Sequence, residues 1–429
     1  MADNNPSPHV VVVSSPGMGH VTPLAGLAKL LVLRHHFTAT LVTFSDLPWS
    51  LPSSISTIQL PTPLLDDLPS NTHFVTRICL TIAHSVSPYV KSSSLSGEPP
   101  ASPPVGHPKL SFYNLQLFLP FFHAPPPYTR RNHHGEFRDL SEPLRLPGCV
   151  PLKGEDFLEP MQERESVVCA WVVHLARNYD LFDGTLVNNF EAFEADAVLF
   201  YKKRGVGKPH VWPIGPLIGF DLDMGTEQSS HKCMEWLNQQ PSKSVVFICF
   251  GSVGTLSLEQ TRELALGLEM SRQRFIWVVR VPNDTEMSNS YFNPKQNGDD
   301  CLGFLPEGFL ERIKDRGMMV QSWGPQREVL SHYATAGFVS HCGWNSTLES
   351  LVNGVPMIAW PLYAEQRMNA VLLVEGVKVA LKAKVRVNGV VRREEVAKVV
   401  KELMEGEGGK EVRRRMQEMK EEAAKAVEK

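Results

Sequence analysis

One local pattern recurs in this 429-residue chain: a short run of β-branched residues, a glycine-containing turn, and a helix with apolar residues on one side. In the first half, the run at residues 9–14 is followed by a turn at 16–20, a helical pattern and a second run at 38–44. Continuous apolar runs are typical of strands buried on both faces of a parallel sheet, and a helix between two of them indicates a right-handed crossover unit. The pattern therefore predicts an α/β fold.

The same pattern returns in the second half and predicts a second parallel sheet. Strands are expected at residues 244–250, 275–280, 317–323, 337–341 and 355–360. Residues 213–230 are rich in glycine and polar residues and have no sustained period, as interdomain segments often do. We predict two Rossmann-like domains, residues 1–222 and 232–429, joined by a linker at 223–231. Ligands should bind beyond the carboxyl ends of the strands, where the two domains face each other.

Composition excludes several classes of protein. The net charge is −3, without the clustered basic surplus of a nucleic-acid binder. Seven cysteines are scattered without a C-x-x-C pair, which suits a reducing compartment better than a disulfide framework or a zinc site. The polar N-terminus lacks a basic n-region, and no apolar stretch reaches the roughly 18 residues of a membrane span. We expect a cytoplasmic protein with no nucleic-acid partner and no membrane span.

The most informative segment spans residues 323–366. It places His341 at the end of an expected strand, next to a glycine and the start of a helix. Ser346 and Glu349 have the spacing of a capping box, with Ser346 as the N-cap and Glu349 three residues later. A helix N-terminus preceded by glycine can bind an anion through its free N–H groups and its dipole. Glu365 and Gln366 add acceptors and donors of the kind that bind sugar hydroxyls.

His20 follows the Gly17-Met18-Gly19 turn at the start of the first expected helix. The helix dipole there disfavours the imidazolium, so a neutral ring could act as a general base for a hydroxyl. A structural residue of the helix start is the other interpretation of this histidine. A dinucleotide fingerprint with Asp46 as its acidic partner is excluded, because Thr22 stands where the third glycine of G-x-G-x-x-G should be.

The segment 323–366 resembles the signature box of the plant secondary-product glycosyltransferases of family 1, which transfer sugar from a UDP donor. The matching residues are Trp323, Pro325, Gln326, the run His341-Cys342-Gly343-Trp344-Asn345-Ser346, Glu349, Gly354-Val355-Pro356 and Glu365-Gln366. Within that family the chain is most similar to the phenol and hydroquinone glucosyltransferases. The resemblance implies a GT-B fold of two facing domains, the first for the acceptor and the second for UDP-glucose.

The resemblance also implies a role for each residue. Uracil would stack on Trp323 and bond to Gln326 and the main chain near Gly324, which replaces the usual alanine. The ribose would be held by Glu349, and the diphosphate by His341, Asn345 and Ser346. The sugar would be held by Trp344, Glu365 and Gln366, and Ser252 would meet the UDP side. His20 would be the catalytic base of an inverting transfer of glucose to the hydroxyl of a small phenolic. The helix N-terminus near Ser346 would meet the leaving-group charge, so no metal or other cofactor is needed.

Residues 91–119 depart from the family pattern. Residues 92–108 hold five prolines and five serines, a composition that excludes a helix or a strand. The family has a buried strand here that ends in an aspartate orienting the catalytic histidine, and this chain has no Asp between Asp67 and Asp139. Loss of an inner strand would leave its sheet neighbours unpaired. We therefore expect an incomplete first domain and impaired turnover, and the chain also ends before the family's last helix.

Two interpretations follow from this departure. The first is an active UDP-glucose-dependent O-glucosyltransferase, and the alternative is a catalytically silent UDP-sugar-binding protein. The acceptor and the oligomeric state are not determined by the sequence. Candidates for an apolar acceptor wall are Phe118, Phe121, Phe122 and Trp171.

Overall fold

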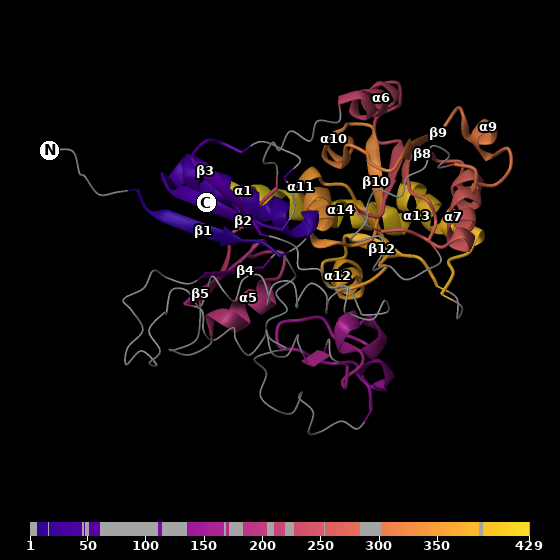
Figure 1. Ribbon diagram of the computed structural model, residues 1–429. Coiled ribbons are helices and arrows are strands. Elements are labelled where there is room, and N and C mark those ends of the chain that lie inside the picture. Colours follow the sequence, from indigo (N-terminus) through magenta and orange to yellow (C-terminus); the bar gives the residue numbers. More distant parts are fainter. Residues whose placement is uncertain are drawn as a thin grey trace, which may run out of the picture.

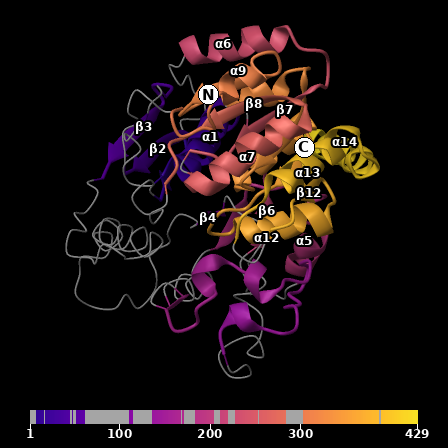
Figure 2. The ribbon, with the colours of Figure 1, turned by 90° about the vertical axis from the view of Figure 1, so that its right-hand side faces the viewer.

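The structure is a computed structural model of the full chain (Figures 1 and 2). It describes residues 7–15, 17–44, 47, 51–60, 110–113, 135–166, 169–170, 183–203, 210–218, 227–252, 254–283, 302–385 and 389–428.

The first half begins with a parallel three-stranded sheet in the order β1-β2-β3. Its strands are β1 (His9–Val13), β2 (Thr38–Thr43) and β3 (Ile55–Gln59), and helix α1 (Met18–His35) connects the first two. Alternate side chains such as Val12 and Leu41 pack under α1, while Val11 and Val13 point the other way and are 59% and 45% exposed. The predicted strand–turn–helix–strand unit is confirmed, but the expectation that its first strand is buried on both faces is wrong, because only the face of β1 under α1 is covered.

A second parallel three-stranded sheet in the first half has the order β4-β5-β6. Its strands are β4 (Leu110–Tyr113), β5 (Gly184–Val187) and β6 (His210–Pro213), and α5 (Ala195–Lys202) lies between the last two in sequence. Within the described residues, neither β1 nor β4 pairs with a further strand on its outer edge. Most of residues 91–119, including the Pro/Ser stretch, lie outside the described residues.

The second half is one parallel six-stranded sheet in the order β12-β11-β10-β7-β8-β9. Its strands are β7 (Val245–Cys249), β8 (Arg274–Val279), β9 (Gly317–Gln321), β10 (Thr335–Ser340), β11 (Met357–Ala359) and β12 (Ala380–Lys382). All side chains of β7 are buried, and they alternate between two apolar cores, one on each face of the sheet. The five strands predicted from the apolar runs are confirmed.

Helices cover both faces of this sheet (Figure 2). One face packs against α6 (Glu227–Asn238), α10 (Gln326–Ser331), α11 (Trp344–Asn353) and α14 (Glu407–Glu428). The other packs against α7 (Leu258–Ser271), α9 (Phe309–Ile313) and α13 (Arg393–Glu405). A short helix α12 (Gln366–Val371) runs into a π-helical turn at Leu372–Gly376. Because strands of the sheet are covered on both sides, their sequences read as continuous apolar runs rather than alternating ones.

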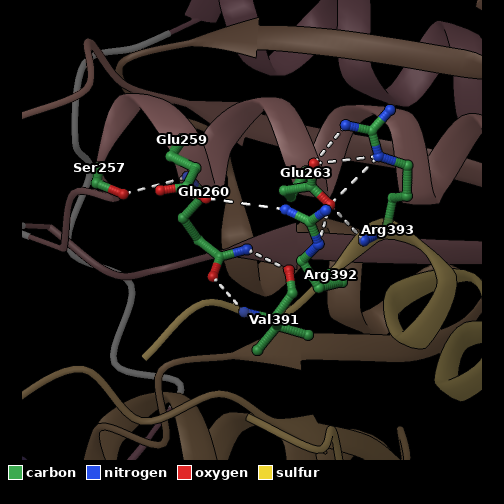
Figure 3. A network of polar contacts seen from close by, with 7 residues as sticks. All are labelled: Ser257, Glu259, Gln260, Glu263, Val391, Arg392 and Arg393. Carbon is green, nitrogen blue, oxygen red and sulfur yellow. Dashed lines mark hydrogen bonds and ion pairs between the residues drawn. The ribbon is translucent and has the colours of Figure 1, made fainter. Parts of the chain in front are cut away.

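A buried polar network fixes α7 against the segment that enters α13 (Figure 3). The buried Glu263 carboxylate accepts from the backbone N–H of Arg393 at 2.7 Å and from its guanidinium. Gln260 bonds to both backbone groups of Val391, donating at 2.9 Å and accepting at 2.8 Å. These bonds satisfy backbone groups that would otherwise be buried without partners.

A separate segment, residues 135–166, belongs to the first half of the sequence but packs against α12 of the second. It has short 3₁₀ turns at Phe137–Asp139, Gly154–Asp156 and Glu159–Met161. Its apolar side chains, including Phe157 and Met161, share one cluster with Met368 and Val371 of α12. The two halves of the chain are therefore joined here by a packed interface.

The segment predicted as the linker, residues 223–231, overlaps the start of a helix. Helix α6 begins at Glu227, so residues 227–231 are helical, while 223–226 lie outside the described residues. The helix forms because its apolar side chains Cys233 and Leu237 can be buried against the second sheet. The domain boundaries of the prediction stay untested. In the part of the chain that the structure describes, no helix is long and apolar enough to cross a membrane.

Candidate active site

His20 lies in the first turn of α1, directly beyond β1. Gly17 precedes the helix with φ 102°, a conformation that favours glycine, and its carbonyl accepts from the N–H of His20 at 3.0 Å. Burial lowers the pKa of His20 below its usual value, so the ring is neutral near pH 7. The direction agrees with the prediction, although desolvation is the cause. Among the described residues, no carboxylate bonds to the ring.

The first turn of α1 is tied to the second half of the chain. Pro23 lies inside α1 and has no N–H to donate to the carbonyl of Gly19, four residues earlier. That carbonyl instead accepts from Nδ2 of Asn345 at 2.9 Å. A helical proline thus exposes an acceptor beside His20, and Asn345 at the start of α11 uses it.

Helix α11 starts two residues before the predicted N-cap. The N-cap is Gly343, which has no side chain to cap the helix. Its backbone carbonyl accepts the first hydrogen bond of the helix, from the N–H of Thr347 at 2.9 Å. The predicted capping box of Ser346 and Glu349 is therefore wrong, because both residues already lie within the helix. Its first backbone N–H groups belong to Trp344, Asn345 and Ser346 and lack intrahelical acceptors. These amides form the candidate anion site.

Three predicted donor-site residues form one connected group. Nε2 of Gln326 donates to Ser346 Oγ at 2.9 Å and to Glu349 Oε2 at 2.6 Å. Burial raises the pKa of Glu349, while the bond from Gln326 partly opposes that rise. Residues that are 20 and 23 positions apart in sequence are thus brought together by the adjacent starts of α10 and α11.

His341 follows β10 and is packed closely by glycine. A Cβ on Gly251 would lie 2.6 Å from its Nε2, so only glycine fits there. Burial lowers the pKa of His341 to about 4, and the ring is therefore neutral. Its Nδ1 is buried and has no hydrogen-bond partner among the described residues. An unpaired buried nitrogen is costly, which makes this atom a candidate contact for a ligand.

Trp344 is buried, and its indole N–H already has a hydrogen-bond partner. Nε1 donates to the backbone carbonyl of Asn188 at 2.7 Å, and the ring packs on Phe193 with centroids 5.6 Å apart. The indole N–H of Trp344 therefore already has an acceptor within the protein, and the sugar contact of this residue stays a prediction. The side chain joins the donor helix to the first half of the chain.

The other residues predicted to contact the uracil or the UDP side differ in their exposure to solvent. Trp323 is half-buried, Ser252 is exposed, and Gly324 is buried. A Cβ on Gly324 would lie 2.7 Å from Cγ2 of Val278, so a larger residue here would require Val278 to move. Val253, beside Ser252, lies outside the described residues.

Glu365 and Gln366 lie together at the start of α12. Burial raises the pKa of Glu365 above its usual range. The Oε1 atom of Gln366 accepts from the backbone N–H groups of Leu362 at 2.9 Å and Tyr363 at 3.0 Å. Gln366 therefore holds the loop that precedes it, in addition to the predicted sugar contact.

Sequence reasoning missed Asn188 and Glu159. Asn188 accepts from the Trp344 indole through its carbonyl, and its Oδ1 accepts from Leu217 N at 2.6 Å. Glu159 bonds to Ala364, which adjoins Glu365. Neither residue lies in a motif, and only the packing of distant segments shows them.

The proposed acceptor-wall residues Phe118, Phe121, Phe122 and Trp171 lie outside the described residues. Within the described ranges, no group of three or more His, Cys, Asp or Glu could hold a metal ion.

Comparisons with known proteins identify the family. Residues 193–423 match the model of the family described as UDP-glucoronosyl and UDP-glucosyl transferase. The chain belongs to this family. Hydroquinone glucosyltransferase of Rauvolfia serpentina is 45% identical, covering 98% of this chain and 94% of that protein. UDP-glycosyltransferase 72B1 of Arabidopsis thaliana is 43% identical, covering 99% and 94%. This family member is accordingly a UDP-dependent glycosyltransferase, as the signature box predicted.

Solved structures confirm the fold class. The Phytolacca americana UGT2 complex with UDP-2fluoro-glucose and pterostilbene is 41% identical with a TM-score of 0.83, covering 98% of this chain and 96% of that chain. A UDP-glucosyltransferase from Polygonum tinctorium, capable of glucosylating indoxyl, is 39% identical with a TM-score of 0.84, covering 99% and 98%. The predicted GT-B architecture of two Rossmann-like halves is thus confirmed. The predicted use of a UDP-sugar donor and a small acceptor by this family is confirmed as well.

Proposed function

We propose that this chain transfers glucose from UDP-glucose to a hydroxyl of a small phenolic, with inversion at the anomeric carbon. The observation that carries the proposal is the bond from Asn345 to the carbonyl of Gly19. It places the start of α11, a candidate diphosphate site, against the turn that bears a neutral His20. A UDP leaving group at the start of α11 and the base His20 would then lie on opposite sides of one contact between the halves of the chain.

The donor is proposed to bind along the second half. The backbone N–H groups at the start of α11, with the hydroxyl of Ser346 and Nδ1–H of His341, would donate hydrogen bonds to the diphosphate oxygens. The connected group of Gln326 and Glu349 would hold the nucleoside, with the ribose on Glu349 and uracil between Gln326 and Trp323.

The sugar end is proposed to lie by the start of α12. Glu365 and Gln366 would bond to the glucose hydroxyls. The raised pKa of Glu365 reflects a carboxylate removed from water, and sugar hydroxyls would add donors to the backbone N–H that already bonds to it.

The chemical step needs one proton transfer and one displacement. As the acceptor oxygen bonds to the anomeric carbon, its proton passes to the neutral ring of His20. The bond from that carbon to the UDP oxygen breaks, and its electron pair leaves with UDP. The N-terminus of α11 stabilises the new negative charge, so the proposed step needs no metal. The protonated ring then returns its proton to solvent.

Two relatives support a phenolic acceptor, since one is named for hydroquinone and another was solved with pterostilbene. The alternative is a catalytically silent UDP-sugar binder. The observation that favours it is in the sequence, which has no Asp between Asp67 and Asp139, where the family pattern has the aspartate that orients the catalytic histidine. A base without such a partner is slower.

The experiment is glucoside formation from UDP-glucose and hydroquinone, paired with calorimetric binding of UDP. We expect the wild type to form glucoside and His20→Ala to lose that activity while its affinity for UDP is retained. The matched control is His231→Ala, because His231 is an exposed histidine of α6, and it should behave as wild type. UDP binding without glucoside in any of the proteins would support the silent binder. Absence of UDP binding to the wild type would overturn both functions.

A cytoplasmic location is also proposed. The cysteines within the described residues, Cys149, Cys169, Cys233, Cys249 and Cys342, all carry free thiols. Free buried thiols are typical of a reducing compartment.

A further inference from the structure

Three consecutive backbone N–H groups hold the loop that leads into Glu365 and Gln366, and each donates a hydrogen bond to a side-chain oxygen. Those of Leu362 and Tyr363 donate to Oε1 of Gln366, within the second half of the chain. The third, from Ala364, donates to Oε2 of Glu159 at 2.7 Å. The last amide before the proposed sugar contacts is therefore satisfied by a carboxylate that comes from the other half of the chain.

Ala364 has an unusual backbone conformation. Its φ is 54°, in the left-handed region that residues other than glycine rarely adopt. Such a conformation persists only where neighbouring groups hold it. Glu159 does so from two atoms, because its own N–H donates to the carbonyl of Ala364 at 3.1 Å while its carboxylate accepts from the N–H. Both backbone polar groups of Ala364 are thus bound to one residue.

Glu159 is itself fixed to the helix that carries Gln366. It begins the 3₁₀ turn Glu159–Met161, and Met161 packs in the same apolar cluster as Met368 of α12. Arg367 of α12 donates to the carbonyl of Glu155 in the same segment at 3.2 Å. The two hydrogen bonds between Glu159 and Ala364 are therefore supported by a packed interface rather than by a free loop.

We propose that Glu159 is a positioning residue for the sugar end of the donor: it holds Ala364 in its left-handed conformation and so sets the directions of Glu365 and Gln366. The proposal rests on the proposed function, in which those two residues contact glucose. It assigns to the first half of the chain a part in recognising the donor sugar. None of the residues proposed to hold the uridine diphosphate portion along α10 and α11 lies in this loop, so the binding of that portion should be insensitive to Glu159.

The test compares the dissociation constants of UDP-glucose and of UDP by calorimetry on the full-length protein. For Glu159→Ala we expect the affinity for UDP-glucose to fall about tenfold, the order of one lost charge-assisted hydrogen bond. The affinity for UDP should change less than about twofold. Glu159→Gln keeps an acceptor oxygen and should restore most of the UDP-glucose affinity. Where glucoside forms, the KM for UDP-glucose should rise with Glu159→Ala.

Glu163→Ala is the matched control. Glu163 is an exposed carboxylate of the same segment and pairs with Arg138 of that segment at 3.1 Å, so both ligands should bind as in wild type. Equal weakening of UDP and UDP-glucose by Glu159→Ala would overturn the proposal in favour of a general structural role. Unchanged UDP-glucose binding, or failure of Glu159→Gln to restore it, would also overturn it. A wild type that does not bind UDP would instead refute the proposed function, so the two failures are distinguishable.

Discussion

The bond between Asn345 and the carbonyl of Gly19 gives a quantitative prediction, because the sequence supplies a natural way to replace it. Asn345→Ala removes the donor at 2.9 Å. Pro23→Ala provides a backbone N–H four residues after Gly19, which can donate to the same carbonyl within α1. The two substitutions therefore act on one acceptor and should be coupled.

The expected magnitude follows from one neutral hydrogen bond. Asn345→Ala alone should lower the free energy of unfolding by about 1 kcal/mol. That change corresponds to a drop in Tm of about 2–4 °C for a unit of ordinary domain size. In the Pro23→Ala background the same substitution should cost little, because the Gly19 carbonyl already has a helical donor. The coupling free energy of the double-mutant cycle should be about 1 kcal/mol.

The assay is thermal and urea unfolding of the four proteins without added nucleotide, so that any contact of Asn345 with a ligand plays no part. Circular dichroism and tryptophan fluorescence should report the same order of stabilities. Purely additive losses, with no coupling between the two sites, would refute the reasoning that Pro23 exposes the acceptor that Asn345 uses.

Three further substitutions test other parts of the structure. In urea unfolding near pH 7, Glu263→Gln should destabilise the protein by about 1.5–3 kcal/mol, the range for hydrogen bonds to a charged group. The bonds from Arg393 hold the pKa of Glu263 below its usual value, so this stability is present above the unfolded-state pKa and is lost as pH falls through the folded-state pKa. A wild-type advantage that grew toward acid would contradict it. Glu349→Ala should weaken UDP binding at least about tenfold by calorimetry, because it removes a buried acceptor bonded to Gln326, and unchanged affinity would remove Glu349 from the site. Trp344→Phe should lower Tm by about 2–4 °C, since the carbonyl of Asn188 loses its donor at 2.7 Å, and an unchanged Tm would show that this bond is not stabilising.

Much of the second half could be predicted from its sequence because its local signals agree with its tertiary environment. The strand at 245–249 is apolar at every position, and the sheet buries both of its faces. The start of α11 shows where local reasoning fails. Ser346 and Glu349 have the spacing of a capping box, but the chain leaving β10 is held so that Gly343 caps the helix. The side chains that could have capped it bond to Gln326 instead.

Residue type also left the role of Trp344 open between core and ligand. Its indole bonds to Asn188, whose position depends on β5 and on the turn after β6, far away in sequence. No local pattern carries that information, since a side chain's partner is decided by which segments the fold brings within hydrogen-bonding distance.

The amino-acid sequence alone determined the parallel α/β architecture and the family, and it predicted a set of donor-site residues, because apolar runs, glycine turns and the signature box are local properties. Only the tertiary structure decided which amides begin α11, that Asn345 reaches Gly19, and that Glu159 holds Ala364. Those contacts join segments from the two halves of the chain, and their geometry is set by packing between the halves rather than by the preferences of either segment.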